Sequence, residues 1–171
     1  EVLARAGLPF QVIPGITAAN GCGAYAGIPL THRGLAQAVT LVTGHLAPDS
    51  EGAGDDLNWA ALAALKQTLV IYMSGRKLAV IAAELVAHGR KHETPAAVVI
   101  AGTTPQQRIV KGTLADIAQR SADAGPGSPA LLYVGEVVGL ADHLGWQMPG
   151  TPTARPGLEP RPGEIRPGDL Q

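Results

Sequence analysis

Three short apolar runs constrain the fold of this chain more than any other feature of its sequence. They are rich in Ala, Val, Ile and Leu, and they occupy 68–73, 96–100 and 131–134. Runs of this length and composition are typical of strands that are buried on both faces of a sheet, as in α/β proteins. We therefore expect a sheet whose strands are buried on both faces.

Segments of helical character separate these runs. Helices are predicted over 17–25, with Thr17 near the first turn, over 59–65 behind the capping residue Asn58, over 78–88 and over 114–121. Further strands are predicted over 40–43 and 107–111, and the strand over 131–134 is expected to reach Val138 at most. Strands alternate with helices, but one or two strands follow one another directly. The predicted fold is therefore α/β with a mixed sheet.

The two ends of the chain differ from this middle part. A helix that stops near Gly7 and a short strand over 10–13 are predicted before the turn Pro14-Gly15. From Pro149 onward 10 of 23 residues are Pro or Gly, which predicts a disordered tail. The chain is accordingly divided into 1–14 (the end of a preceding domain and a linker), 15–146 (a carboxyl-terminal α/β domain) and 147–171 (the tail).

The composition is that of a folded protein and excludes several classes of partner. Of the 171 residues, 46% are hydrophobic and 16% are charged, and the formal net charge is −1. The sequence thus offers no global basic field for nucleic acid or an acidic membrane, and no apolar run approaches the roughly 18 residues of a membrane span. Cys22 is the single cysteine, which excludes an internal disulfide and indicates a cytosolic protein with a small buried thiol.

The amino terminus indicates a fragment. The chain has no initiator Met and no signal-peptide pattern, and it begins within a helical pattern. We therefore expect a truncated protein.

A turn rich in small residues is the first candidate site. In Pro14-Gly15-Ile16-Thr17-Ala18-Ala19 a strand ends, the chain turns and a helix begins. Backbone N–H groups at a helix start favour a polar or anionic ligand group, and small side chains let the ligand approach the backbone. The same residues also suit an ordinary tight turn before a close-packed helix.

Four other segments carry chemically useful residues, and each also has an ordinary structural explanation. They are Gly27-Ile28-Pro29-Leu30-Thr31-His32-Arg33, Val42-Thr43-Gly44-His45, the strand-end residue Met73, and Ala101-Gly102-Thr103-Thr104. Arg33 suits a carboxylate or phosphate, His45 follows a buried strand where α/β sheets place ligands, and Gly102 would let a flat ligand lie against the backbone. A solvated loop, a structural histidine, a core methionine and a simple turn explain the same residues.

Several common sites have no motif in this sequence. It contains no G-x-x-x-x-G-K-[ST] phosphate loop, no G-x-G-x-x-G after a strand and no Cys/His cluster with zinc spacing. The sequence therefore gives no reason to expect a metal ion or a dinucleotide.

Taken in order, the segments resemble the uroporphyrinogen III C-methyltransferases, a group of tetrapyrrole methylases. The resemblance continues through Asp56-Leu57-Asn58-Trp59, Lys66-Gln67-Thr68-Leu69-Val70, Tyr72-Met73, Gly102-Thr103, Gln107-Arg108, Gly112-Thr113-Leu114 and Gly135-Glu136-Val137-Val138, and it ends at Leu144 and Trp146. It covers about residues 1–146, which is nearly everything except the tail.

The resemblance implies the carboxyl-terminal half of a two-domain α/β enzyme, usually a homodimer, with S-adenosylmethionine in the cleft between the domains. Such enzymes methylate two carbons of uroporphyrinogen III, which gives precorrin-2 and S-adenosylhomocysteine, on the way to sirohaem or cobalamin. The positions that match cofactor contacts are Thr17, Ala18, Met73 and Gly102. Arg33 matches a substrate-carboxylate position, and His32 and His45 match positions that line the cleft.

The sequence also departs from the family pattern. Two glycine-rich loops and the acid/base Asp and Lys of the amino-terminal half have no counterpart, so we expect no catalytic residue here and no methyl transfer by this chain alone. Asn58 stands where an Asp is common, and Ser74 where a Gly is common. A later precorrin methyltransferase and a non-catalytic dimerisation or binding module are the alternatives. Thr31-His32-Arg33 and 56–59 favour the uroporphyrinogen enzyme over the later methyltransferase.

Overall fold

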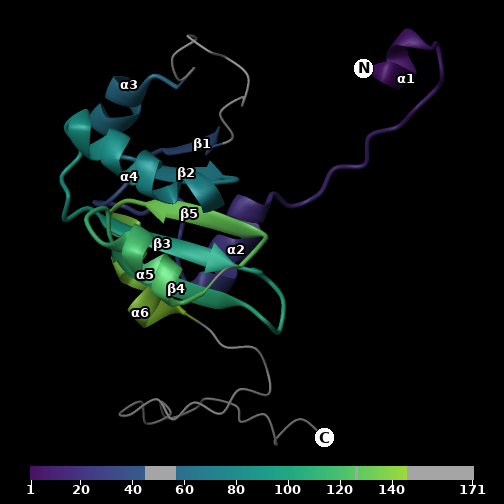
Figure 1. Cartoon of the computed structure of the whole chain (residues 1–171). Helices are drawn as coiled ribbons and strands as arrows, with labels where there is room; N and C mark the ends of the chain where they lie inside the picture. Colours follow the sequence, from purple (N-terminus) through teal and green to yellow (C-terminus); the bar gives the residue numbers. More distant parts are fainter. Residues whose placement is uncertain (45–56, 126, 146–171) are drawn as a thin grey trace, which may run out of the picture.

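A mixed five-stranded sheet with helices on both faces forms the body of the molecule in the computed structural model, which describes residues 1–44, 57–125 and 127–145 (Figure 1). The strands are β1 (Val39–Thr43), β2 (Thr68–Tyr72), β3 (Pro95–Ile100), β4 (Arg108–Thr113) and β5 (Ala130–Val134). Their order across the sheet is β1-β2-β5-β3-β4. Because β1 pairs with β2 in parallel and every other neighbouring pair is antiparallel, the predicted mixed α/β fold is confirmed.

The helices are short, and three of them, α2, α3 and α4, begin where the sequence predicts. They are α1 (Val2–Arg5), α2 (Ala18–Ala26), α3 (Trp59–Ala64), α4 (Leu78–Ala87), α5 (Ile117–Asp123) and α6 (Ala141–Leu144), with 3-10 turns η1 (Gly75–Lys77) and η2 (Glu136–Leu140). Thr17 is the N-cap residue of α2, and Asn58 caps α3 by accepting a hydrogen bond of 3.0 Å from the amide of Ala61. None of the helices in the described part of the chain is long and apolar enough to cross a membrane.

Two apolar layers enclose the central strands. On one face Leu69, Ile71 and Leu132 pack against α3, α4 and α5, which contribute fully buried residues such as Ile81. On the opposite face Val70, Ala97, Val99, Leu131 and Tyr133 pack against α2 and η2. Strands β2, β3 and β5 are therefore buried on both faces, as their apolar sequences predict.

The position of β5 aligns the ends of the strands on either side of it. Tyr72 of β2 and Val99 of β3 both lie opposite Leu131 of β5. Since β5 runs antiparallel to both strands, β2 and β3 point the same way, and β1 is parallel to β2. The carboxyl ends of β1, β2 and β3 thus lie at one edge of the sheet, called here the carboxyl edge.

The structure corrects the prediction for 10–13 and decides where the strand over 131–134 ends. The predicted strand over 10–13 pairs with no strand in the described part of the chain, and Phe10 and Ile13 are 58% and 84% exposed. In Figure 1 this segment runs away from the sheet towards α1, so no neighbouring strand is available to it. Strand β5 ends at Val134, as predicted for 131–134, and it does not continue through Val138 because Gly135 has a φ of 141° and the chain then enters η2.

Other predictions fall outside the described residues or are not tested by the fold. The polar loop over 48–56 and the tail over 147–171 lie outside the described residues. Residues 1–16 contain no buried side chain, whereas α2 belongs to the packed layers. The division of the chain into domains stays a prediction.

Asp116 supplies a test of how the α5 side of the sheet is stabilised. Its carboxylate accepts a 2.7 Å hydrogen bond from the Thr113 amide and also bonds Arg120, and these interactions hold its pKa below the ordinary value. A depressed pKa means that this stabilisation is present above the unfolded pKa of about 3.9 and is lost as pH falls through the lower folded value. We expect Asp116→Asn to lower the melting temperature at neutral pH and to flatten the decline of the melting temperature below about pH 4.

The matched control is Asp123→Asn in the same helix, whose carboxylate accepts one exposed side-chain bond from Gln119. Thermal melts between pH 2 and 8 compare the three proteins. Parallel curves for the wild type and Asp116→Asn would show that Asp116 does not link pH to stability.

Candidate functional site

The carboxyl edge collects the residues that the sequence marks as cofactor contacts. Met73 follows β2, and Ala101, Gly102 and Thr103 follow β3. The start of α2 joins them, because the hydroxyl of Thr17 is hydrogen-bonded to the hydroxyl of Tyr72, the last residue of β2. Ligands of α/β sheets commonly bind outside the carboxyl ends of the strands, so the edge is suitably placed for a binding site.

Backbone strain concentrates at the same edge. Met73, Ala101 and Thr103 have φ angles of 53°, 49° and 67°, and they are the non-glycine residues with positive φ among those the structure describes. L-residues adopt this region rarely, and such residues cluster where a structure presents ligands. Met73 is also 61% exposed, so it does not fill the core as the ordinary explanation of a strand-end methionine requires.

The first turn of α2 presents an amide with no partner in the described part of the chain. The amides of Asn20 and Gly21 donate to the carbonyl of Thr17 at 3.0 and 3.1 Å, and the amide of Ala19 donates to the hydroxyl of Tyr72 at 2.9 Å. No described acceptor bonds the amide of Ala18, which is an exposed residue. An amide of this kind at a helix start attracts a polar or negatively charged group of a ligand.

Tyr133 and Cys22 contribute to the packing of α2 on the sheet. The Tyr133 hydroxyl donates a 2.8 Å hydrogen bond to the carbonyl of Ala19, and the ring is completely buried. Burial raises the pKa of Tyr133 far above its ordinary value, with smaller contributions from Cys22 and Tyr72, so the hydroxyl stays a neutral donor. Burial likewise raises the pKa of the Cys22 thiol, which therefore acts in packing and not as a nucleophile.

Gly102 touches α2 so closely that a side chain at this position would force Cys22 to move. A Cβ at this position would lie 2.3 Å from the sulfur and 2.9 Å from the Cβ of Cys22. The sequence suggested that this glycine admits a flat ligand, but helix packing alone already requires it. Its contact with a cofactor stays a prediction.

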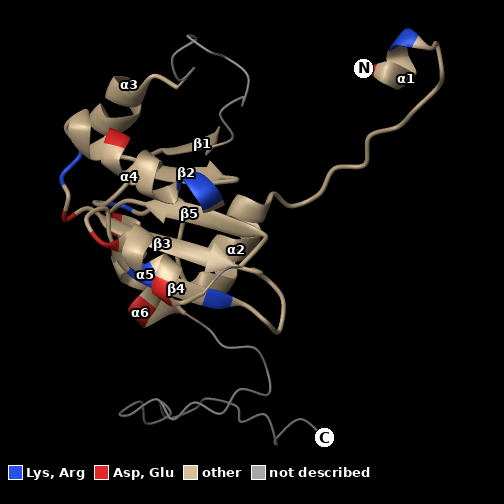
Figure 2. Cartoon of the chain, in the orientation of Figure 1, with Lys and Arg blue, Asp and Glu red and all other residues tan. Residues whose placement is uncertain are grey.

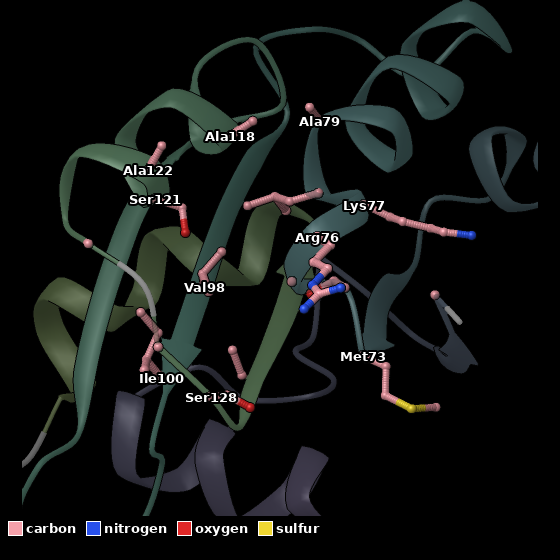
Figure 3. Close-up of a pocket in the computed structure, with 17 residues that line it drawn as sticks. Met73, Arg76, Lys77, Ala79, Val98, Ile100, Ala118, Ser121, Ala122 and Ser128 are labelled. Carbon is pink, nitrogen blue, oxygen red and sulfur yellow. The ribbon is translucent and has the colours of Figure 1, made fainter. Parts of the chain in front are cut away.

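An open groove of about 1320 Å³ extends from the carboxyl edge between α4 and α5 (Figure 3). Val98, Ile100 and Ala130 of the sheet form its apolar floor, and Ser121 of α5 lies on one wall. Arg76 and Lys77 of η1 are the charged residues among those that line it. In Figure 3 Arg76 turns towards the groove, whereas Lys77 extends away from it.

The charge of the groove is therefore positive although the chain as a whole is nearly neutral. Figure 2 shows η1 in blue beside the ends of β2 and β5, and the strands β2, β3 and β5 carry no charged residue. Arg76 is exposed and has no carboxylate within ion-pair distance among the described residues. A guanidinium in this setting can bind an incoming carboxylate through two parallel hydrogen bonds.

The predicted substrate residues lie elsewhere. His32 and Arg33 are exposed in a tight turn that is closed by a 2.8 Å hydrogen bond from the His32 amide to the Ala36 carbonyl. Neither residue lines the groove, and His45 lies outside the described residues. Their roles stay predictions.

The structure also identifies residues that sequence reasoning missed. Tyr72 is held at the edge by hydrogen bonds to residues distant in the sequence, and Arg76 follows it in η1 beside the groove; no short motif records either. A signal for Tyr72 did exist, because a tyrosine at the end of an otherwise apolar strand needs a partner for its hydroxyl. In the described part of the chain no three metal-ligating side chains gather into a possible metal site.

Comparisons with known proteins agree on the family. A model described as Tetrapyrrole (Corrin/Porphyrin) Methylases matches residues 1–118. Siroheme synthase 1 of Yersinia pseudotuberculosis serotype I (strain IP32953) is 53% identical over 156 residues, which are 90% of this chain and 32% of that protein. The siroheme synthase of Stutzerimonas stutzeri (strain A1501) is 56% identical over 146 residues, 85% of this chain and 30% of that protein. The chain thus spans about a third of the length of these relatives.

Solved structures show the same relationship in three dimensions. Uroporphyrin-III C-methyl transferase from Thermus thermophilus, complexed with S-adenyl homocysteine, is 36% identical with a TM-score of 0.65, covering 81% of this chain and 57% of that one. A cobalt precorrin-4 methyltransferase of cobalamin biosynthesis is 26% identical with a TM-score of 0.69, covering 80% and 56%.

The contact between Gly102 and Cys22 can be tested directly. Gly102→Ala forces a methyl group into the sulfur, and we expect a loss of about 1–3 kcal/mol in the free energy of unfolding, as for other overpacked sites. Cys22→Gly removes both clashing atoms, so the double variant should be more stable than the sum of the single changes predicts.

Gly139→Ala is the matched control, because a Cβ there meets nothing within 4 Å. Urea unfolding of all four variants gives the free energies. Additive effects of the Gly102 and Cys22 changes would contradict the close contact.

Proposed function

We propose that this chain, which belongs to the tetrapyrrole (corrin/porphyrin) methylase family, binds S-adenosylmethionine and serves the C-methylation of uroporphyrinogen III to precorrin-2. The observation that carries the proposal is the convergence of Thr17, Ala18, Met73 and Gly102 at the carboxyl edge, with the Ala18 amide unbonded. The bound S-adenyl homocysteine of the Thermus thermophilus relative supports the choice of cofactor.

The residues at the edge suit a ligand with a polar end and an apolar part. The Ala18 amide can donate to a carboxylate or ribose oxygen, and the Thr17 hydroxyl lies next to it in the chain. The exposed side chain of Met73 can cover an apolar part of the ligand and keep water away. S-adenosylmethionine supplies a methyl group on a sulfonium, so the contribution required from these residues is mainly to position the two reactants.

The groove beside the edge suits the other reactant. Uroporphyrinogen III carries eight carboxylates around an apolar macrocycle. The apolar floor and the cationic rim at Arg76 match these two properties. Arg33, which does not line the groove, is the carboxylate contact that the resemblance implies. The homodimer expected from the resemblance stays a prediction.

A later precorrin methyltransferase is the second candidate. The cobalt precorrin-4 methyltransferase has a TM-score of 0.69 and the uroporphyrin-III enzyme 0.65, so the fold does not separate the two activities. The 53% identity to a siroheme synthase favours uroporphyrinogen III as substrate. The mass of the product that the longest open reading frame containing this chain forms from uroporphyrinogen III distinguishes the candidates.

The cofactor site is tested by titrating residues 1–171 with S-adenosylhomocysteine in a calorimeter. We expect saturable binding to one site, weakened by roughly 1–3 kcal/mol in Met73→Ala, which is the range for truncating a contact that becomes buried. Leu65→Ala removes a similarly exposed side chain, 53% against 61%, that precedes β2 at the opposite edge, and it should leave binding unchanged. A wild-type chain that binds no S-adenosylhomocysteine would contradict the proposal.

The substrate contact is tested by comparing Arg76 with Arg33, both of which are exposed. A bidentate Arg–carboxylate bond contributes about 1.5–3 kcal/mol, so Arg76→Ala should raise KM for uroporphyrinogen III about 10- to 100-fold in the longest reading frame that contains this chain. Arg76→Lys keeps the charge but loses the planar fork, and should recover only part of the loss. Binding of S-adenosylhomocysteine should stay the same.

Arg33→Ala and Arg33→Lys are measured alongside. An effect confined to Arg33 would move the carboxylate contact to the turn after α2. A combined loss of cofactor binding and melting temperature in either alanine variant would identify that arginine as a structural residue.

A further inference from the structure

The start of α2 lacks the usual side-chain cap. Ser, Thr, Asp or Asn at the N-cap position normally accepts a hydrogen bond from an amide in the first turn. Thr17 occupies this position, but its side chain makes no such bond. Its hydroxyl is turned to the hydroxyl of Tyr72 instead.

Tyr72 supplies the capping hydrogen bond that the side chain of Thr17 does not make. Its hydroxyl accepts a 2.9 Å hydrogen bond from the amide of Ala19, a residue that is completely buried. The two residues are 53 positions apart in the sequence. The Ala19 amide has no other acceptor within the described chain, so the hydroxyl of Tyr72 satisfies a group that would otherwise be buried and unbonded.

The same side chain connects two parts of the proposed cofactor site. Tyr72 is the last residue of β2 and directly precedes Met73, which has the unusual φ of 53°. The hydroxyl of Tyr72 also bonds the Thr17 hydroxyl and the Ala19 amide, the two positions on either side of Ala18. A movement of the Tyr72 ring would therefore displace both the Met73 segment and the first turn of α2.

We infer that Tyr72 is a positioning residue, whose hydroxyl caps α2 from the neighbouring strand and thereby holds Thr17 and Ala18 where they meet the ligand. This inference rests on the proposed function for the identity of the ligand. The cap itself rests only on the hydrogen bonds of Tyr72. The hydroxyl contacts no ligand atom in this role and acts through α2.

The test uses residues 1–171 with Tyr72→Phe, which removes one oxygen and retains the ring. Amide hydrogen exchange, followed by NMR, reports on the Ala19 amide and on the remaining amides of α2. We expect exchange at Ala19 to accelerate roughly three- to tenfold relative to the middle of α2, and the Kd for S-adenosylhomocysteine to rise by a similar factor, as for one lost hydrogen bond.

Tyr133→Phe is the matched control. It also removes one hydroxyl that bonds Ala19, but this hydroxyl donates to the carbonyl and not to the amide. We expect a lower melting temperature with an unchanged ratio of Ala19 exchange to that of the rest of α2. A purely structural role of Tyr72 would give the same pattern in both variants.

Each outcome separates the inference from the function on which it rests. Unchanged exchange at Ala19 in Tyr72→Phe overturns the cap. Faster exchange with an unchanged Kd overturns the positioning role. A wild-type chain that fails to bind S-adenosylhomocysteine overturns the proposed function and the ligand part of the inference together, and the Ala19 amide then decides whether the cap exists.

Discussion

The hydrogen-bonded pairing of β5 with β2 and β3 is the constraint on which the rest of the structure depends. Leu131 lies opposite both Tyr72 and Val99, so two strands from distant parts of the sequence end within one residue of the same level. Because β5 is antiparallel to both, their carboxyl ends point to one edge. Without this strand between them, the segments after Tyr72 and Val99 would have no fixed relation to one another.

The position of α2 on this sheet depends on a glycine and two hydroxyl groups as much as on buried apolar area. Gly102 lets Cys22 approach the end of β3, and the hydroxyls of Tyr72 and Tyr133 bond the backbone of Ala19 from two strands. Apolar burial drives the layers together without fixing an exact position, since it has no direction. The hydrogen bonds are directional, and they determine where the first turn of α2 lies.

Patterns that are local in the sequence were predictable, and relations between distant residues were not. The apolar runs identified β2, β3 and β5, and the capping residues placed the starts of α2 and α3. Nothing local shows that β5 inserts between β2 and β3, because strand order is decided by packing. The apolar run over 10–13 has strand composition, but a strand also needs a neighbour to bond, which the sequence pattern cannot supply. The role of Tyr72 was hidden for the same reason, since its partners are 53 and 55 residues away.

Pairing on both sides of β2 and β3 also explains how the carboxyl edge keeps its strained backbone. A non-glycine residue in a sparsely populated backbone region costs on the order of 1–3 kcal/mol and persists only where its surroundings over-determine it. Strands β2 and β3 each have two neighbours in the sheet and are covered on both faces, so the positions just before Met73 and Ala101 are held by pairing and packing on every side. The pairing of the central strands therefore maintains the strained backbone of the residues that follow them at the carboxyl edge. A ligand that binds there meets a backbone that is already in place, and it does not have to order the edge as it binds.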